Sequence, residues 1–443
     1  MRHNWLHLDL KGAIPKVHRL IDMLGYCRNC GYNGIVLEYD DRIPWRSWPE
    51  VRNGGYSMAE QAELLAAARK LELEVVPLIQ IHGHLEWLLK HPEYHDWREN
   101  GVGSEICPLH PEVPARLEKW IDEVVELHPQ SRFIHLGADE TLYLGTCPKC
   151  SRLDKMEIYL NHVSKMCRYA LGKGLTPLIW ADMFWSEKCP DLADSLPEGT
   201  ILVDWRYEGV PPFESTTILR RGKHPVMGAS GIMTGWWEHC YRVQADPQSR
   251  VENVSGWFRY ADDNELGLIH TTWTRGASLW NIYGPWHGHL PAFIAGGNPA
   301  RWERHPWCGF TRNLTGIIDR DIPDELEKTA AETLKLPAFD DAERECLRWW
   351  NLALRYQAIQ KSVQIHRSTR NCLDRVAEFV GRDETMYRRN CITPFSGLQD
   401  KLEAWEQEAR RFWTDNELSN ENEFFATHSE IMKDEINLYR REP

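Results

Sequence analysis

The 443-residue sequence has no long apolar run and no excess of positive charge, and its first residues lack the pattern of a signal peptide. No stretch reaches the roughly 18 apolar residues of a membrane span. A net charge of −13 argues against a nucleic-acid or anionic-membrane partner, because either would need a basic surface. The first residues, MRHNWLHLDLKG, lack the apolar core of a signal peptide, so we expect a cytoplasmic protein.

The order of segments along the chain predicts the fold class. Eight short aliphatic or β-branched runs alternate with helical patterns across residues 1–320, which predicts an α/β fold of the (β/α)8 TIM-barrel type. A doubly wound sheet is the alternative, but no glycine-rich phosphate loop follows the first run. The segment 57–73 opens with Ser57 three residues before Glu60, a capping box. The runs are 5–10, 34–39, 74–81, 133–138, 177–182, 200–205, 224–229 and 266–273.

The pattern changes in the last quarter of the chain. Residues 321–443 contain charged segments of helical periodicity and no strand-like run, so we expect an α-helical C-terminal region that packs on the barrel. The sequence leaves the oligomeric state open, a homodimer included.

The 12 cysteines are scattered along the chain, and we expect reduced thiols and no disulfide framework. Two Cys-x-x-Cys units stand out, Cys27 with Cys30 and Cys147 with Cys150. Four converging thiolates would form a zinc site. The first pair is expected just before the second strand and the other after the fourth, at opposite ends of a barrel. We therefore expect no shared metal.

Polar and aromatic residues gather where the predicted strands end, and barrel enzymes place their chemistry at those ends. Singly, each has a structural explanation: Asp41 is suited to capping a helix, and His82 and His84 to hydrogen-bonded wall positions. Together, acids, histidines and tryptophans on one rim indicate a carbohydrate site. The strand-end residues are Asp9, Lys11, Asp40, Asp41, His82, His84, Asp139, Glu140, Trp180, Asp182, Asp204, Trp205, Trp236, Trp237, Glu238 and Trp273.

The segment FIHLGADETLYLG, residues 133–145, ends its apolar run on two adjacent acids, Asp139 and Glu140. Its part HLGADE (135–140) matches the His-x-Gly-Gly/Ala-Asp-Glu motif of family 20 glycoside hydrolases, which are exo-acting β-N-acetylhexosaminidases. Residues 7–16 and 75–94 resemble the first and third strands, with their loops, of the hexosaminidase D-like branch. The likeness extends over residues 5–285.

The resemblance implies substrate-assisted catalysis, in which the sugar's own 2-acetamido oxygen is the nucleophile. Glu140 would then be the general acid/base, and Asp139 would orient the acetamido group and stabilise an oxazolinium ion. An ionised Asp139 would also help to keep Glu140 protonated by raising its pKa. No cofactor and no metal are implied. The remaining matched residues are Asp41 and His84 as a relay to Glu140, Trp180, Trp205 and Trp273 as the acetamido pocket, and Asp9 and His135 as further substrate-binding residues.

The sequence also departs from the family pattern. Asn4 lies near the place of an arginine that grips sugar hydroxyls, and residues 80–84 read QIHGH in place of Asp-x-Pro-Gly-His. The tyrosine and aspartate expected after the seventh strand have no clear counterpart, and the candidates are Glu238, Tyr143 and Tyr207. The expected substrate is a glycan or small molecule with a terminal β-linked N-acetylhexosamine, and the branch favours GalNAc over GlcNAc.

Three other functions remain open from the sequence. A two-carboxylate retaining β-glycosidase would use Glu140 as acid/base and Glu238 as nucleophile, with the carboxyls about 5 Å apart. Metal-dependent hydrolysis would use His82 and His84. A non-catalytic sugar-binding barrel would keep the tryptophans but would not need adjacent acids.

Overall fold

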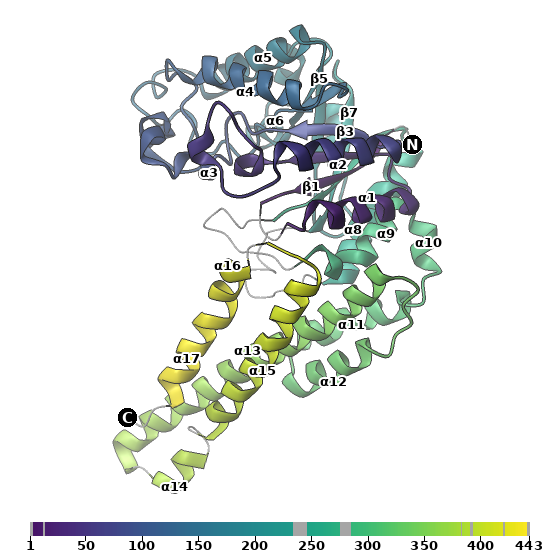
Figure 1. The fold of residues 1–443 in the computed structure, drawn as a ribbon. Helices are drawn as coiled ribbons and strands as arrows, with labels where there is room; N and C mark the ends of the chain where they lie inside the picture. The colour runs from purple at the N-terminus through teal and green to yellow at the C-terminus, as the bar shows by residue number, and fades with distance from the viewer. Residues whose placement is uncertain are drawn as a thin grey trace.

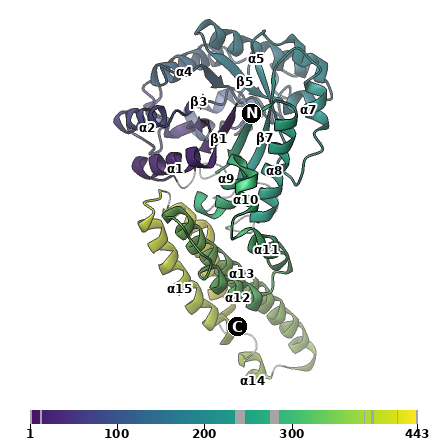
Figure 2. The same ribbon diagram turned by 90° about the vertical axis from the view of Figure 1, so that its right-hand side faces the viewer.

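The computed structural model describes residues 3–11, 14–233, 246–274, 285–381, 383–389, 393–419 and 421–440. Eight parallel strands form a closed barrel in chain order, with β1 paired to β8 and helices outside it, as Figures 1 and 2 show. This confirms the predicted (β/α)8 fold. The strands are β1 (Asn4–Asp9), β2 (Gly34–Glu38), β3 (Glu74–Leu78), β4 (Phe133–His135), β5 (Thr176–Trp180), β6 (Ile201–Trp205), β7 (Val226–Met233) and β8 (Gly267–Thr272).

Side-chain alternation along each strand divides the core in two. On β1, Trp5 packs inside the barrel, whereas Leu6 and Leu8 belong to the larger core that includes the surrounding helices. Strands buried on both faces need apolar residues at successive positions, which explains the near-continuous runs in the sequence. The inner cluster comprises Trp5, Val36, Val76, Leu78, Leu178, Trp180, Val203, Met227, Ala229, Ile269 and Trp273.

Local signals set the ends of several outer helices. Ser57 and Glu60 form the predicted capping box at the start of α2, and α1 closes on Gly31, whose φ is 118°. The helices are α1 (Val17–Cys30), α2 (Met58–Lys70), α3 (Glu86–Leu89), α4 (Val113–Leu127), α5 (Lys155–Gly172), α6 (Asp182–Ser186), α7 (Glu214–Leu219), α8 (Pro247–Asp263) and α9 (Leu290–Gly297). Short helical turns are η1 (Asp40–Arg42), η2 (Pro49–Val51), η3 (Pro92–Trp97), η4 (Glu99–Gly101), η5 (Pro190–Ser195) and η7 (Trp286–His289).

The last part of the chain is helical and extends away from one side of the barrel (Figures 1 and 2). It contacts the barrel where Ile14 and Ser419 exchange hydrogen bonds of 3.0 and 2.8 Å and where Trp350 donates to the Gly288 carbonyl. None of the helices in the described part of the chain has the length and apolar character needed to cross a bilayer. These helices are α10 (Pro299–Glu303), α11 (Cys308–Arg320), α12 (Pro323–Thr333), α13 (Asp341–Val380), α14 (Glu384–Tyr387), α15 (Thr393–Asp415), α16 (Glu421–Phe425), the π-helical η9 (Ala426–Glu430) and α17 (Ile431–Arg440).

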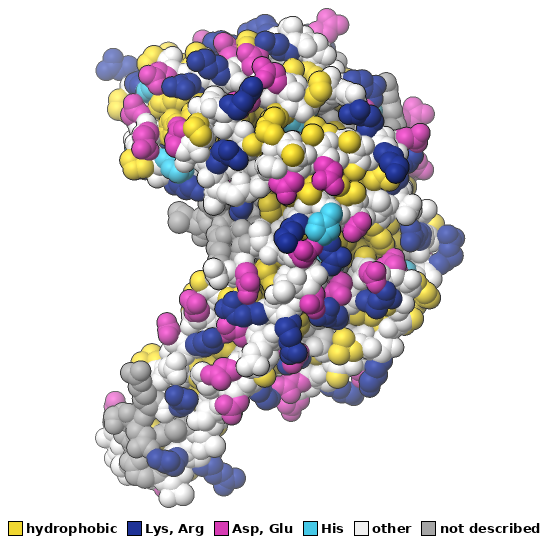
Figure 3. Space-filling view, in the orientation of Figure 1, with side chains coloured by type: hydrophobic (Ala, Val, Ile, Leu, Met, Phe, Trp, Pro, Cys, Tyr) yellow, Lys and Arg dark blue, Asp and Glu magenta, His cyan; other side chains and the backbone are white. Residues whose placement is uncertain are grey.

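The space-filling view in Figure 3 shows acidic and basic side chains interspersed over the barrel and the C-terminal helices on the face drawn there. Neither sign gathers into a continuous patch on that face.

Candidate active site

The ends of three neighbouring strands bring an acidic centre together. Asp139 and Glu140 follow β4, and His84 follows β3. The Nε2 atom of His84 lies 3.2 Å from Asp139 Oδ2 and 3.2 Å from Glu140 Oε2. Asp182, at the start of α6 behind β5, accepts the backbone N–H of Glu140 at 3.0 Å. One imidazole therefore contacts both acids of the motif, and a third carboxyl holds the backbone between them.

The chain bends sharply at these residues. Ala138, Glu140 and His84 adopt the left-handed region, with φ of 70°, 47° and 53°. Such conformations cost non-glycine residues about 1–3 kcal/mol each and persist only where the surroundings enforce them. One such restraint is the hydroxyl of Tyr159 on α5, which donates to the Ala138 carbonyl at 2.9 Å. The bend ends β4 at His135, earlier than the sequence predicts, and turns the two acids toward the rim.

Two glycines let the β3 and β4 loops approach each other. Gly137 has φ of 64°, and a Cβ there would lie 1.8 Å from Gln80 Oε1. A Cβ on Gly83 would lie 2.5 Å from the carbonyl oxygen of Asp139. The positive φ of Gly137 therefore favours glycine there, and a Cβ would in addition force the end of the Gln80 side chain to shift.

Asp182 has a raised pKa. Burial, and then the nearby charges of Asp139 and Glu140, raise the pKa of Asp182 to about 8. At neutral pH Asp182 is mostly protonated, so the three carboxyls carry at most about two negative charges. The sequence places Asp182 at the rim through the run ending IWAD, but its role beside Glu140 depends on a contact between two strand ends.

Aromatic side chains line the barrel interior beneath the acids. The rings of Trp180 and Trp273 lie 5.9 Å apart, and Trp205 stacks on Tyr207 at 5.0 Å. His135 lies 4.3 Å from Trp180, and its Nδ1 accepts the N–H of Gly137 at 3.0 Å. Burial lowers the pKa of His135 to about 3, so the ring is neutral and its Nε2 carries the proton. These flat apolar faces form a wall on which a sugar's acetamido group could rest.

A buried charge cluster lies beside this wall, at the ends of β1 and β2. Lys11 Nζ lies 3.1 Å from Asp9 Oδ1, 2.7 Å from Glu38 Oε1 and 2.9 Å from Asp40 Oδ2. Burial opposes the ionisation of Glu38, but Lys11 and His7 hold its pKa well below its usual range. Burial and the charges of Glu38 and Asp9 raise the pKa of Asp40 well above its usual range. Asp9 therefore belongs to a cluster in which one ammonium contacts three carboxyls, and Glu38 was not among the sequence candidates.

Other candidates have different surroundings. Asp41 Oδ2 lies 3.3 Å from Lys90 Nζ and Asp41 Oδ1 lies 3.5 Å from Arg42 Nε, so the relay from Asp41 through His84 stays a prediction. The Tyr143 side chain is 48% exposed on the β4 loop, while its backbone N–H donates to Glu105 at 3.0 Å. Glu238, with Trp236 and Trp237, lies outside the described residues.

His82 and His84 point to different places. His82 is fully buried, with its ring 5.3 Å from His162 and stacked 6.3 Å from Tyr159. Burial lowers the pKa of His82 well below its usual range. His84 contacts the acid pair, so this geometry does not favour a shared metal between the two histidines.

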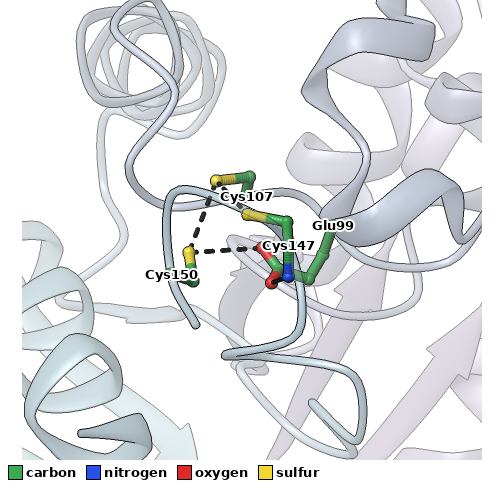
Figure 4. A group of neighbouring side chains, drawn as sticks. All are labelled: Glu99, Cys107, Cys147 and Cys150. Atoms are coloured by element: carbon green, nitrogen blue, oxygen red, sulfur yellow. Dashed lines mark hydrogen bonds between the residues drawn. The ribbon is translucent and has the colours of Figure 1, made fainter. Parts of the chain in front are cut away.

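A separate cluster contains one of the two Cys-x-x-Cys units. Cys147 and Cys150 lie beside Cys107 and Glu99, as Figure 4 shows. Neither Cys27 nor Cys30 belongs to this group, which is the one set of potential metal ligands found within the described ranges.

The structure and site define a class: a (β/α)8 barrel with carboxylates and aromatic residues at the carboxyl ends of its strands. The model described as "Glycosyl hydrolase family 20, catalytic domain" matches residues 22–253, more than half of the chain. The chain belongs to glycosyl hydrolase family 20, as the motif at residues 135–140 predicts.

Similar proteins agree with this membership. Hexosaminidase D of Homo sapiens is 34% identical over 296 residues, which cover 61% of this chain and 60% of that protein. Hexosaminidase D of Bos taurus is 36% identical over 214 residues, which cover 46% and 62%. The chain therefore spans about three fifths of the length of these curated relatives. A β-N-acetylhexosaminidase from Bacteroides fragilis shares the fold, with a TM-score of 0.52, 19% identity, and coverage of 67% of this chain and 65% of that one.

Proposed function

We propose that this protein is an exo-acting retaining β-N-acetylhexosaminidase that removes terminal β-linked N-acetylhexosamines, with GalNAc favoured over GlcNAc. Its family membership and its likeness to proteins called hexosaminidase D support the activity. The preference for GalNAc depends on that likeness alone. The substrate is the terminal sugar of a glycan or of a smaller glycoside.

The observation that carries the proposal is the contact of a single histidine with two adjacent acids in different surroundings. The side chain of Asp139 is 8% exposed, whereas that of Glu140 is 31% exposed, and His84 lies 3.2 Å from each carboxyl. A buried anion suits a partner that stays in the pocket, such as the acetamido group. A more exposed acid suits proton exchange with the leaving group and with water.

In this mechanism the acetamido oxygen attacks C1 of the sugar and the glycosidic C1–O bond breaks. Glu140 gives its proton to the departing oxygen, and Asp139 accepts the acetamido N–H and stabilises the positive charge of the oxazolinium ion. Water then attacks C1 and Glu140 takes a proton from it, which regenerates the acetamido group. Two displacements at C1 leave the β configuration unchanged.

Aryl β-GalNAc, β-GlcNAc and β-galactoside substrates test this proposal on the wild type, Glu140→Gln and Asp139→Asn. We expect turnover only where the sugar carries the acetamido group, faster release from β-GalNAc, and inhibition by a thiazoline mimic of the oxazoline. Both variants should lose activity by orders of magnitude. Glu208→Gln, an exposed change after β6, is the matched control and should keep wild-type rates.

Equal turnover of the plain β-galactoside would contradict the substrate-assisted mechanism. It would favour the two-carboxylate alternative, whose second acid, Glu238, lies outside the described residues. A fully active Asp139→Asn variant would also contradict the proposal, because the orienting anion would then have no role. Faster release of GlcNAc than of GalNAc would overturn only the preference.

A further inference from the structure

Three thiols and one carboxylate meet in the loops behind the acid pair. Cys107 Sγ lies 3.6 Å from Cys147 Sγ and 3.5 Å from Cys150 Sγ, and Cys150 Sγ lies 3.4 Å from Glu99 Oε2. All four potential ligand atoms lie within 4.8 Å of one another, and all four residues are buried. Figure 4 shows the three sulfur atoms and the carboxylate facing a common centre.

These separations match the edges of a zinc tetrahedron. Zn–S bonds of about 2.3 Å at tetrahedral angles place two sulfurs about 3.8 Å apart. A Zn–O bond of about 2.0–2.2 Å places the oxygen about 3.5–3.7 Å from a sulfur. The two sulfur–sulfur distances from Cys107 and the distance from Cys150 Sγ to Glu99 Oε2 are only slightly shorter, and the other pairs lie within 4.8 Å. We propose that Glu99, Cys107, Cys147 and Cys150 form a structural zinc site.

A disulfide explains the cluster less well. A disulfide bond is about 2.05 Å long, and the cysteines of this cluster are free thiols. Cys107 is about equally distant from both other sulfurs, so no preferred pair exists. Any one bridge would leave the third thiol and the carboxylate buried together, whereas a metal ion uses all four groups.

The carboxylate is positioned as metal ligands usually are. Glu99 Oε1 accepts the backbone N–H groups of Thr146 and Cys147 at 2.9 and 2.8 Å, which leaves Oε2 toward Cys150. Such hydrogen bonds orient a ligating carboxylate. Glu99 is fully buried and forms no ion pair with Lys, Arg or His among the residues placed in the structure. A cation at the centre would supply the missing positive charge.

The ligand types select the metal. Thiolates favour Zn²⁺ over the hard cations Mg²⁺ and Ca²⁺, which prefer oxygen ligands. Four protein ligands complete a tetrahedral shell, so the site is closed and its role is structural rather than catalytic. The turn between Cys147 and Cys150 supports binding of one metal ion by both cysteines, because the N–H groups of Cys150 and Ser151 both bond the Cys147 carbonyl, at 3.1 and 2.9 Å.

The zinc would fasten the two loops that carry the acidic centre. Cys107 follows Ile106, whose N–H bonds the carbonyl of His82, two residues before His84. Cys147 lies on the loop after β4, which also carries Asp139 and Glu140. The strand pairing beneath these loops is short: β3 and β4 share one ladder pair, Leu78 with His135, and beyond it the N–H groups of Ile79 and Ile81 bond the carbonyls of His135 and Leu136, whereas β2 and β3 share a ladder of five. The metal would reinforce the contact between β3 and β4.

The test measures metal and does not depend on any glycosidase activity. The full chain is purified under reducing conditions with zinc in the growth medium, and its bound metal is measured by mass spectrometry. We expect one zinc per chain in the wild type and in Cys27→Ser/Cys30→Ser, the other Cys-x-x-Cys unit. We expect the zinc to be lost in Cys147→Ser/Cys150→Ser.

A second measurement covers the case in which that double variant fails to fold. Wild-type protein exchanged into Co²⁺ should show thiolate-to-cobalt charge-transfer absorption and the visible bands of tetrahedral cobalt. Glu99→Gln should alter those bands while its folding, judged by circular dichroism, is kept. Wild-type protein with no bound zinc, and no such bands after exposure to Co²⁺, would overturn the site. Zinc retained by the folded Cys147→Ser/Cys150→Ser variant would also overturn it.

Discussion

The raised pKa of Asp182 gives a prediction whose sign and size follow from the structure. Burial and the charges of Asp139 and Glu140 raise this pKa to about 8, from an unfolded value of about 3.9. The folded protein therefore holds a proton that the unfolded chain releases. A raised pKa stabilises the fold at low pH, and this contribution is lost as the pH rises from about 4 to about 8.

The linkage relation converts these two pKa values into an energy. Between pH 5 and pH 8 the contribution of Asp182 falls by about 3–4 kcal/mol, at about 1.4 kcal/mol for each pH unit over most of the interval. Asp182→Asn abolishes this titration, and its amide oxygen can still accept the N–H of Glu140. The stability advantage of the variant over the wild type should therefore grow by about 3–4 kcal/mol between pH 5 and pH 8.

Urea unfolding of both proteins at pH 5 and pH 8, followed by tryptophan fluorescence, measures the difference. Comparing variants at each pH cancels the titration of groups that both proteins share. Asp191→Asn, an exposed acid in the same βα unit, is the control and should shift both midpoints equally. If Asp182→Asn loses as much stability as the wild type between pH 5 and pH 8, Asp182 is ionised in the fold and the reasoning is refuted.

Two further substitutions test the surroundings of the site. Gly137→Ala places a methyl group 1.8 Å from Gln80 Oε1 at φ of 64°, so it should destabilise the protein by about 1–3 kcal/mol and reduce turnover. The control is Gly172→Ala, where nothing lies within 4 Å, and it should leave the melting temperature unchanged or higher. Equal melting temperatures for the two variants would contradict this prediction. Lys11→Met removes the ammonium that contacts Asp9, Glu38 and Asp40, so urea unfolding at pH 7 should show a loss of about 3–5 kcal/mol. Part of that loss should be recovered at low pH, where the carboxyls are protonated, and a loss independent of pH would show that they are not held by Lys11.

Much of the fold could be predicted because its signals are local. Each strand is buried on both faces and therefore appears as a short apolar run, and Ser57 with Glu60 starts α2 through contacts three residues apart. Strand ends were harder to predict. The apolar run at 133–138 continues past β4, because composition does not reveal the left-handed φ of Gly137 and Ala138.

The candidate site likewise has features that the sequence predicts and features that it does not. The adjacent acids and the strand-end tryptophans are readable from the sequence, because a barrel places every strand end on one rim. The family resemblance implied His84 as a partner of Glu140, but the residue pattern by itself does not show contacts between different strands. That His84 contacts both acids and that Lys11 contacts three carboxyls depends on how neighbouring strand ends are spaced and turned.

The cysteines show most clearly what sequence and tertiary structure each decide. Cys147 and Cys150 are close together because only two residues in one turn separate them, and the spacing along the chain is enough to predict this. Their partners, Cys107 and Glu99, lie 40 to 51 residues earlier in the segment after β3, and only the folded chain brings them to the pair. Local spacing constrains neighbours along the chain, whereas contacts between loops arise only when the barrel closes and brings β3 beside β4.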